Sequence, residues 1–414
     1  MIERIAFLSL HSCPLQQPGQ GDAGGMNVYL RDLGIAMAGA GVDVVAFTRR
    51  SDTPTPEVVD VVPGFRVVHI EAGPAEPMPI RDMYRLVGEF ADETLAWIDQ
   101  TGEKYDVIHS HYWLSGWAGV LLKEKLGLPL ANSFHTLGRV KDLTRRADQQ
   151  ASEVIRTMTE EEVIARSDCV VASTPFELND LIEHYGADPT RLCISPPGIR
   201  HDMFMPGDKE AARMWTGLDR GPTMMYAGRI QPLKGVDIAI RALALMTVDN
   251  TQFVVVGGPS GSDGQAEMER LVALAEDLEV PDRIHFIPPL PRHQLVDFYQ
   301  AADVVIMPSR SETFGLVAAE AQSCGTPVVA ANVGGLPFIV EDGRSGLLVS
   351  GHNPADYAKA LDRVVGNPEF AAELSAGAVE HSQRFSWDTT VERLLELYEG
   401  IAANPRGAAS QPGK

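Results

Sequence analysis

A glycine-rich segment near the start of the chain is the first place where a phosphate could bind. Gly21-Asp-Ala-Gly-Gly-Met-Asn27 lies between an apolar run at residues 5–10 and a helical pattern at residues 24–40. Gly24 and Gly25 let the backbone approach a ligand closely, and free N–H groups at a helix N-terminus favour a phosphate. The segment lacks the GxGxxG spacing of dinucleotide-binding loops. We predict phosphate contact here, with a plain strand-to-helix turn as the alternative.

Two cations lie on a second loop of this kind. Gly228-Arg-Ile-Gln-Pro-Leu-Lys-Gly235 directly follows an apolar run at residues 224–227. The guanidinium of Arg229 can bind a diphosphate through two hydrogen bonds, and Lys234 supplies a point charge. The spacing differs from the GxxxxGK[ST] of a P-loop. In an acidic chain, two cations on this loop favour a diphosphate site over the alternative of solvated surface charges.

Two carboxylates, Glu312 and Glu320, are separated by seven residues across a loop and a following helical pattern. Glu320 has apolar neighbours, so its carboxylate needs hydroxyl or amide partners if it is buried. The hydroxyls of a ribose would satisfy it, and Glu312 in the loop could meet a sugar or a phosphate. Taken alone, the two acids are better explained as a helix-terminal acid and a buried, internally bonded glutamate than as ligand-binding groups.

Histidines and hydroxyl groups close two further apolar runs. The segments are His109-Ser-His-Tyr-Trp-Leu-Ser-Gly116 and Asn132-Ser-Phe-His-Thr136. Polar groups at the carboxyl ends of two strands favour a sugar or polyol pocket. A metal site on His109 and His111 is the weaker interpretation, because no third ligand stands at a recognisable spacing. The segments also offer no recognisable Ser-His-Asp or Cys-His nucleophile arrangement.

Alternating apolar runs and helical patterns must position these groups. Runs that predict strands lie at residues 5–10, 44–47, 65–70, 107–109, 128–133 and 169–172, and again at 224–227, 253–256, 284–286, 304–307, 328–330 and 347–349. Helical patterns lie between them, and a Pro- and Gly-rich segment at residues 195–206 separates the halves. The sequence therefore predicts an α/β protein with two doubly wound domains and a ligand cleft between them. Residues 404–414 are expected to be disordered.

Composition excludes several classes of protein. The 414 residues contain 35 Lys+Arg and 56 Asp+Glu, a formal net charge of −21, which disfavours nucleic acid and anionic lipid as partners. The four cysteines (Cys13, Cys169, Cys193 and Cys324) form no CxxC pair, so we expect neither a disulfide framework nor a zinc site. The N-terminus does not read as a signal peptide, and we expect no transmembrane segment. A cytoplasmic protein is predicted.

Over nearly the whole chain, these features together resemble the retaining family 4 glycosyltransferases of GT-B fold. Within that family, five motifs are similar to those of the branch that acts in mycothiol biosynthesis and moves N-acetylglucosamine from UDP to 1D-myo-inositol 3-phosphate. The motifs are Gly21-Asp-Ala-Gly-Gly-Met-Asn-Val-Tyr29, His109-Ser-His-Tyr-Trp-Leu-Ser-Gly116, Arg229-Ile-Gln-Pro-Leu-Lys234, Gly257-Gly-Pro-Ser-Gly261 and Ser311-Glu-Thr-Phe-Gly-Leu-Val317. The resemblance implies two Rossmann-like domains facing a central cleft, a UDP-sugar donor, a phosphorylated polyol or sugar acceptor, no cofactor needed for the chemistry, and a homodimer.

The resemblance also implies a domain division and a role for each site residue. The acceptor-binding domain is expected at residues 1–200 plus 385–414, with a crossover helix near residues 389–402, and the donor-binding domain at residues 201–384. Arg229 and Lys234 would hold the diphosphate against the Gly25 backbone. Glu320 would bind the ribose, Glu312 the donor sugar or pyrophosphate, and the Leu290 backbone the uracil. The acceptor would contact His11, Asp22, Gly24, Asn27, Tyr112, Thr136 and Arg156, and His135 would lie near the anomeric carbon. A structural magnesium ion would sit on main-chain oxygens of Tyr299, Gln300, Ala302 and Thr326.

Two departures from that branch keep alternatives open. Ile80 stands where the branch carries a lysine for the acceptor phosphate, with Arg81 adjacent, and Leu137-Gly-Arg139 is similar to sucrose-phosphate synthases. A glucosyltransferase that uses UDP-glucose and another sugar phosphate is therefore the first alternative. The second is a non-catalytic protein that binds a nucleotide sugar. A phosphorylase that uses pyridoxal phosphate is disfavoured, because no lysine stands in a recognisable setting for that cofactor.

Overall fold

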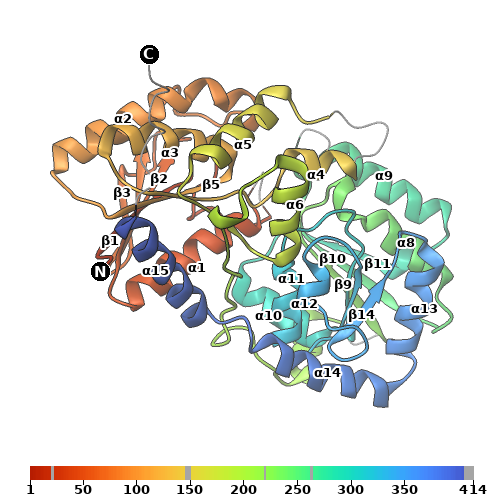
Figure 1. The fold of residues 1–414 in the computed structure, drawn as a ribbon. Coiled ribbons are helices and arrows are strands. Elements are labelled where there is room, and N and C mark those ends of the chain that lie inside the picture. The colour runs from red at the N-terminus through yellow and green to blue at the C-terminus, as the bar shows by residue number, and fades with distance from the viewer. Residues whose placement is uncertain (20–22, 145–150, 219–220, 262–263, 405–414) are drawn as a thin grey trace. The chain divides into compact units, whose positions relative to one another are not determined.

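The computed structural model describes residues 1–19, 23–144, 151–218, 221–261 and 264–404. The chain divides into two compact units (Figure 1). The first comprises Met1–Gln16, Met26–Pro196 and Trp387–Lys414, and the second comprises Gln17–Gly25 and Pro197–Ser386. Within the described ranges, no helix combines the length and the apolar character that crossing a bilayer requires.

The first unit is built on an eight-stranded sheet with the order β3-β4-β2-β1-β5-β6-β7-β8. All neighbours run parallel except β3, which pairs antiparallel with β4 at the edge. The interior strands are almost entirely buried, as expected for a parallel sheet covered on both faces. The strands are β1 (Arg4–Leu8), β2 (Asp43–Arg49), β3 (Val58–Val62), β4 (Phe65–Ile70), β5 (Val107–His111), β6 (Leu130–Ser133), β7 (Cys169–Ala172) and β8 (Leu192–Ile194).

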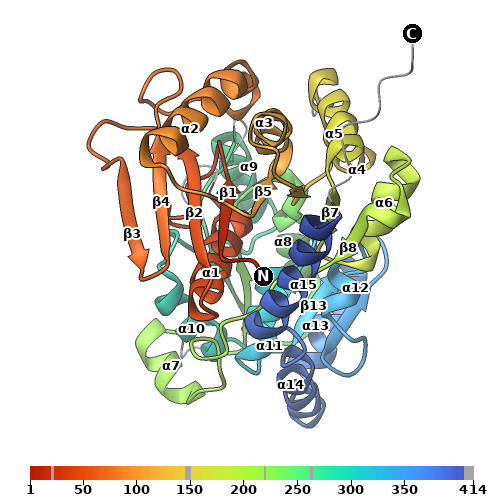
Figure 2. The ribbon, with the colours of Figure 1, turned by 60° about the vertical axis from the view of Figure 1, so that its left-hand side comes forward.

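Helices cover both faces of this sheet and form two apolar cores with it. One core joins side chains of α2 (Val87–Thr101), α3 (Tyr112–Leu126), α5 (Val154–Arg166) and α6 (Pro175–Tyr185) to the sheet. The other joins α1 (Gly25–Gly39) and α15 (Trp387–Ala403), as Figure 2 shows. A short helix, α4 (Gly138–Leu143), follows β6, and a 3-10 helix spans Ile80–Leu86. The last helix of the chain is therefore part of the core of the first unit.

The second unit is built on a six-stranded parallel sheet with the order β11-β10-β9-β12-β13-β14. Its strands are β9 (Thr223–Ala227), β10 (Gln252–Val256), β11 (Ile284–Ile287), β12 (Val304–Met307), β13 (Val328–Ala331) and β14 (Gly346–Val349). Its helices are α7 (Lys209–Thr216), α8 (Val236–Leu245), α9 (Gly264–Asp277), α10 (Arg292–Ala301), α11 (Leu316–Ser323), α12 (Leu336–Ile339), α13 (Pro354–Val365) and α14 (Pro368–Ser382).

In both sheets the strand order reverses beside the first strand. β9 has β10 on one side and β12 on the other, and β1 has β2 on one side and β5 on the other. In open α/β sheets, ligands bind outside the carboxyl ends of the strands at such switch points. The expectation of two doubly wound α/β halves is thus confirmed, whereas the edge strands β3 and β8 were not predicted. Most of the segment 404–414 lies outside the described residues.

Candidate functional site

Three of the residues expected to bind the donor lie at the switch point of the second sheet. Arg229 and Lys234 lie on the loop after β9, and Glu312 lies on the loop after β12, the neighbouring strand. The Nζ of Lys234 and the Oε2 of Glu312 are 2.6 Å apart, and their side chains are only 20% and 16% exposed. Two predicted ligand-binding residues, 78 positions apart in the sequence, therefore form one ion pair.

Main-chain hydrogen bonds fix these loops to one another. Arg310 donates from its backbone N–H to the carbonyl of Leu233 at 2.8 Å, and Gly335, after β13, donates to the carbonyl of Glu312 at 2.8 Å. Gly235 closes the first loop with φ of +70°, and a Cβ there would lie 2.2 Å from the carbonyl oxygen of Pro308. Only glycine permits this approach of two loops, which sets the separation of Lys234 and Glu312.

The glycine-rich segment lies beside the same guanidinium. Residues Gln17–Gly25 belong to the second unit, and a Cβ on Gly24 would lie 3.0 Å from Nε of Arg229. A Cβ on Gly25 would lie 3.3 Å from Cδ1 of Leu316. Helix α1 begins at Gly25. The structure thus brings together the two segments for which we predicted phosphate contact, while Asp22 lies outside the described residues.

Tyr226 is a member of this site that the sequence did not reveal. It lies buried near the end of β9, and its hydroxyl donates to the carbonyl oxygen of Arg229 at 2.8 Å. Burial, together with the nearby carboxylate of Glu312, raises the pKa of its phenol. The phenol therefore stays a neutral donor and fixes the backbone that carries Arg229. The only sequence signal was a tyrosine at the end of an otherwise apolar run.

Glu320 lies on α11 and is buried, as predicted. Its Oε1 accepts from Nη2 of Arg292 at 2.8 Å, and its Oε2 accepts from the hydroxyl of Tyr299 at 3.1 Å. The sequence argument expected a hydroxyl or amide partner and did not find the guanidinium, which lies 28 residues away. The role of Glu320 at a ribose stays a prediction. Leu290, which follows β11, is partly buried against the core of this unit.

The four residues expected to hold magnesium are neighbours, and one of their main-chain oxygens already accepts hydrogen bonds. The carbonyl oxygen of Tyr299 accepts from Oγ1 of Thr326 at 2.6 Å and from the N–H of Ala302 at 3.3 Å, and the amide of Gln300 donates to Met205. Magnesium usually binds through one or two carboxylates in near-octahedral geometry. In the described part of the chain, no cluster of three His, Cys, Asp or Glu side chains could hold a metal ion. A magnesium ion on the main-chain oxygens of these four residues stays a prediction, and we route no step through a metal.

In the first unit, three histidines from β5 and the loop after β6 form a row, in which His109 and His111 are buried and His135 is partly buried. Nδ1 of His109 lies 2.6 Å from the hydroxyl of Tyr398, and Nε2 of His109 lies 2.9 Å from Oγ of Ser133. Nδ1 of His111 lies 3.1 Å from Nε2 of His135. Burial lowers the pKa of His109 to about 3 and that of His135 to about 4, and it lowers the pKa of His111 as well. All three imidazoles are therefore neutral near pH 7.

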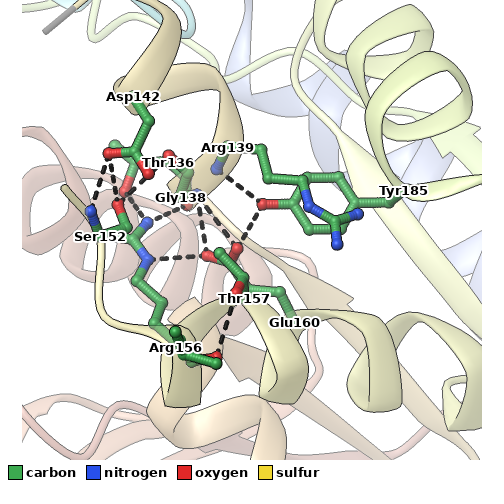
Figure 3. A network of polar contacts seen from close by, with 10 residues as sticks. Thr136, Gly138, Arg139, Asp142, Ser152, Arg156, Thr157, Glu160 and Tyr185 are labelled. Carbon is green, nitrogen blue, oxygen red and sulfur yellow. Dashed lines mark hydrogen bonds and ion pairs between the residues drawn. The ribbon is translucent and has the colours of Figure 1, made fainter.

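Three of the residues expected at the acceptor meet around one guanidinium. Nη2 of Arg156 donates to the carbonyl oxygen of Thr136 at 2.9 Å and to its hydroxyl at 3.2 Å (Figure 3). The guanidinium carbon lies 5.1 Å from the centre of the Tyr112 ring, a cation–π contact, and the ring of His11 lies 4.4 Å from the same ring. This cluster is a buried cation with aromatic and hydroxyl neighbours.

The backbone near this cluster is strained. Tyr112 and His135 both adopt a left-handed conformation, with φ of +78° and +60°. Non-glycine residues in this region cost roughly 1–3 kcal/mol and are concentrated at functional sites.

Asn27, which is also expected at the acceptor, lies in the first turn of α1 and donates from Nδ2 to the carbonyl oxygen of Cys13 at 2.7 Å.

Comparison with known proteins shows the family of the chain. Residues 24–198 match the glycosyl transferase 4-like domain, and residues 208–381 match the glycosyl transferases group 1. The D-inositol 3-phosphate glycosyltransferase of Streptosporangium roseum is 43% identical over 411 residues, covering 97% of this chain and 94% of the relative. The enzyme of the same name from Acidothermus cellulolyticus is 45% identical over 416 residues, covering 99% and 92%.

Solved structures agree on the fold. A sucrose-phosphate synthase from Thermosynechococcus elongatus is 32% identical, with a TM-score of 0.90 over 97% of this chain and 99% of the other. An Anabaena protein solved with UDP and glucose is 19% identical, with a TM-score of 0.76 over 96% and 100% of the chains, which shows the fold alone. The chain belongs to the group 1, or family 4, glycosyltransferases of GT-B fold and is an enzyme of that family.

Proposed function

We propose that this enzyme moves N-acetylglucosamine from UDP to 1D-myo-inositol 3-phosphate and retains the anomeric configuration. The observation that carries the proposal is the buried guanidinium of Arg156 held between Thr136 and Tyr112. In a chain with a net charge of −21, this is the cation that a phosphorylated polyol requires. The relatives that share 43–45% of their residues with this chain carry the name of that acceptor.

The donor is assigned to the loops of the second unit. Arg229 and Lys234 would bind the diphosphate, with the backbone of Gly25 against it. Glu312, held 2.6 Å from Lys234, would contact the donor sugar, and Glu320 the ribose. The backbone at Leu290 would contact the uracil. The Anabaena protein solved with UDP and glucose shares the fold, which supports a uridine nucleotide as the donor class.

The chemistry needs no covalent nucleophile in this scheme. The acceptor hydroxyl attacks the anomeric carbon from the face of the leaving group, and its proton passes to the departing diphosphate as the carbon–oxygen bond to that group breaks. Arg229 and Lys234 stabilise the negative charge that develops on the diphosphate. His135, with its pKa lowered to about 4, is neutral and places no positive charge beside the anomeric carbon. Closure of the donor and acceptor units during transfer would exclude water.

A mass-detected transfer assay tests the proposal. UDP-N-acetylglucosamine and 1D-myo-inositol 3-phosphate are incubated with the enzyme, and product and UDP are followed together. We expect stoichiometric product and UDP, with an α-linkage by NMR. Absence of transfer to any inositol phosphate would contradict the acceptor assignment. The resemblance further predicts a homodimer in the cytoplasm, and light scattering during gel filtration would test the dimer.

A glucosyltransferase similar to sucrose-phosphate synthase is the second candidate. The solved structure of that name has a TM-score of 0.90 at 32% identity, and the segment Leu137-Gly-Arg139 is similar to the sequence of those enzymes. UDP-glucose and UDP-N-acetylglucosamine in one reaction separate the two candidates. The first candidate predicts that N-acetylglucosamine is transferred preferentially, and a preference for glucose with a sugar phosphate acceptor would support the second.

A further inference from the structure

We propose that Glu160, assisted by Tyr185, is a positioning residue for the acceptor phosphate. Its buried carboxylate holds the guanidinium of Arg156 and the loop that carries Thr136 in one fixed arrangement. This inference rests on the proposed function, because it takes the phosphate of the acceptor as the ligand of Arg156.

Three elements converge on the carboxylate of Glu160. The side chain lies on α5 with no exposed surface, and it accepts from Nε of Arg156 at 2.8 Å, one turn earlier on the same helix. Both of its oxygens accept from the backbone N–H of Gly138, at the start of α4, at 3.1 Å. Its Oε2 also accepts from the hydroxyl of Tyr185 on α6 (Figure 3). The helices α4, α5 and α6 are thereby tied together at one point.

The guanidinium of Arg156 keeps donors for a ligand in this arrangement. Arginine has five N–H donors, of which Nε is used by Glu160 and Nη2 by the carbonyl and hydroxyl of Thr136. Among the described residues, nothing accepts a hydrogen bond from Nη1 of Arg156. The hydroxyl of Thr136 accepts from Nη2 and so retains its own O–H to donate. A phosphate that bound here would receive hydrogen bonds from both side chains.

The backbone of the loop comes close to the ion pair at Gly138. A Cβ on Gly138 would lie 3.0 Å from Oε2 of Glu160 and 3.2 Å from Nε of Arg156. The loop backbone therefore approaches the carboxylate as closely as a hydrogen bond requires. Thr136 is two residues before this contact, so the carboxylate also sets the position of the Thr136 hydroxyl.

Two effects of Glu160 on phosphate binding, one electrostatic and one entropic, oppose each other, which makes the proposal testable. The carboxylate repels a phosphate bound on the far edge of the same guanidinium. It also removes the rotational freedom of a long side chain that would otherwise have to be ordered when the phosphate binds. If positioning dominates, neutralising Glu160 weakens phosphate recognition, whereas if repulsion dominates, the same change strengthens it.

The experiment compares a phosphorylated and an unphosphorylated acceptor in four proteins. These are wild type, Glu160→Gln, Tyr185→Phe and the control Glu162→Gln, which alters an exposed residue of the same helix that pairs with Arg166 at 3.3 Å. With UDP-N-acetylglucosamine as donor, kcat/KM is measured for 1D-myo-inositol 3-phosphate and for myo-inositol. We define the phosphate preference as kcat/KM for 1D-myo-inositol 3-phosphate divided by kcat/KM for myo-inositol. We expect Glu160→Gln to lower this ratio by about tenfold or more, chiefly by raising KM for the phosphorylated acceptor.

The remaining variants and the donor KM separate positioning from general damage. Tyr185→Phe keeps the ion pair and should lower the ratio less, in the same direction, so it carries the test if Glu160→Gln does not fold. Glu162→Gln should match wild type, and the KM for the donor should be unchanged throughout. If the ratio is unchanged or raised in Glu160→Gln and unchanged in Tyr185→Phe, the positioning role of Glu160 is refuted, whereas the proposed function still stands.

A failure of the proposed function gives a different pattern. If wild type shows no preference for a phosphorylated acceptor, the acceptor assignment fails, and the positioning role fails with it. If wild type prefers another sugar phosphate, the same ratio is measured with that compound and its dephosphorylated form. The positioning role is then judged on that ratio by the same criteria.

Discussion

Lys234 is the side chain on which transfer depends most directly in this scheme. Replacing Lys234 by alanine removes a cation from the departing diphosphate. It also removes the ammonium group that lies 2.6 Å from the carboxylate of Glu312 in the wild-type protein. Loss of one such stabilising group costs roughly 10²–10³ in rate. We expect Lys234→Ala to lower kcat by about that factor at saturating donor, with little change in the thermal midpoint.

The control for this prediction is Lys359→Ala. Lys359 lies on α13 with a side chain 78% exposed and pairs only loosely with Asp356, at 3.3 Å. Surface pairs of this kind contribute little, so this variant should keep wild-type kcat and stability. Turnover by Lys234→Ala close to that of Lys359→Ala would refute the role of Lys234.

The buried histidines give the first unit a dependence on pH. The folded state keeps His109 neutral, with its pKa lowered by burial to about 3, whereas the unfolded chain binds a proton near pH 6.5. The stabilising contribution of this neutral histidine is therefore complete above about pH 6.5 and is lost as the pH falls toward about 3. His109→Gln removes this dependence and leaves an amide that can face Tyr398 and Ser133.

Urea titrations between pH 7 and pH 4.5 measure the effect. The free energy of unfolding of His109→Gln should fall less steeply than that of wild type as the pH is lowered. The difference in slope is expected to approach about 1.4 kcal/mol per pH unit, the value for one proton. Parallel slopes in the two proteins would show that His109 is protonated in the folded state as readily as in the unfolded one.

The N-terminus of α6 contains a carboxyl group with the opposite behaviour. Thr174 caps the helix by accepting from the N–H of Glu177 at 3.1 Å, and Glu177 accepts from the N–H of Ser173 at 2.7 Å. Burial raises the pKa of Glu177 to about 7. The folded state therefore holds a proton that the unfolded state releases near pH 4.5, and stability is lost as the pH rises through about 7.

Glu177→Gln tests this element. Glutamine keeps an oxygen that can accept from Ser173 and never ionises, so the variant should gain stability relative to wild type between pH 5 and pH 8. The measurement is the difference in the free energy of unfolding at those two pH values. A difference that does not change with pH would mean that Glu177 is already ionised at pH 5.

The loops of the donor site depend on glycine at a second contact. A Cβ on Gly335 would lie 2.1 Å from the carbonyl oxygen of Thr313, beside the residue that pairs with Lys234. Overpacking of this kind costs roughly 1–3 kcal/mol. We expect Gly335→Ala to lower stability and to raise the KM for the donor, because the loop that carries Glu312 must move away.

Gly88 provides the matched control for that change. It lies in the first turn of α2, and a Cβ there would meet nothing within 4 Å. Gly88→Ala should leave the donor KM unchanged and raise stability by about 0.5–1 kcal/mol through better helix propensity. An unchanged donor KM in Gly335→Ala would show that the Glu312 loop tolerates the shift.

The helices and strands were predictable where an apolar pattern was strong. The buried parallel strands of both sheets and the helices near β1 and β9 follow from such runs, and the loops that carry Arg229 and Lys234 follow from glycine and proline. The edge strand β3 was missed because Asp60 interrupts its run of valines, and the edge strand β8 was missed because it has only three residues. The Glu160–Arg156 pair was missed because both residues look like surface charges on a helix, and only α4 and α6 bury them.

Long-range partners explain most of what sequence reasoning missed in the site. Arg292 neutralises Glu320 from a different helix, and Tyr398 reaches His109 across 289 residues. Sequence spacing does not encode such pairs, because they depend on which helix covers which face of a sheet. The sequence therefore predicted that these loops follow buried strands, and the fold was needed to find the long-range partners of their side chains.

The chain as a whole is not two consecutive domains, since its last helix completes its first unit. The first unit ends with Trp387–Lys414, and α15 contributes Trp387, Val391, Leu394 and Tyr398 to a core with β1 and α1. Burial of such side chains is worth roughly 1.5–3 kcal/mol each, so four of them approach the ~5–15 kcal/mol that stabilises a typical domain. Removing α15 should therefore unfold the first unit while leaving the loops that carry Arg229, Lys234 and Glu312 intact.

A chain that ends at Ser386 tests this division of labour. We expect it to lose transfer and the cooperative unfolding of the first unit, yet to retain measurable binding of UDP by calorimetry, because Pro197–Ser386 contains the strands and cations of the donor site. A chain that ends at Asn404 keeps all of α15 and should match wild type in both assays. Wild-type transfer by the shorter chain would mean that the core around Tyr398 is dispensable, whereas loss of UDP binding along with transfer would mean that the second unit needs the first in order to fold.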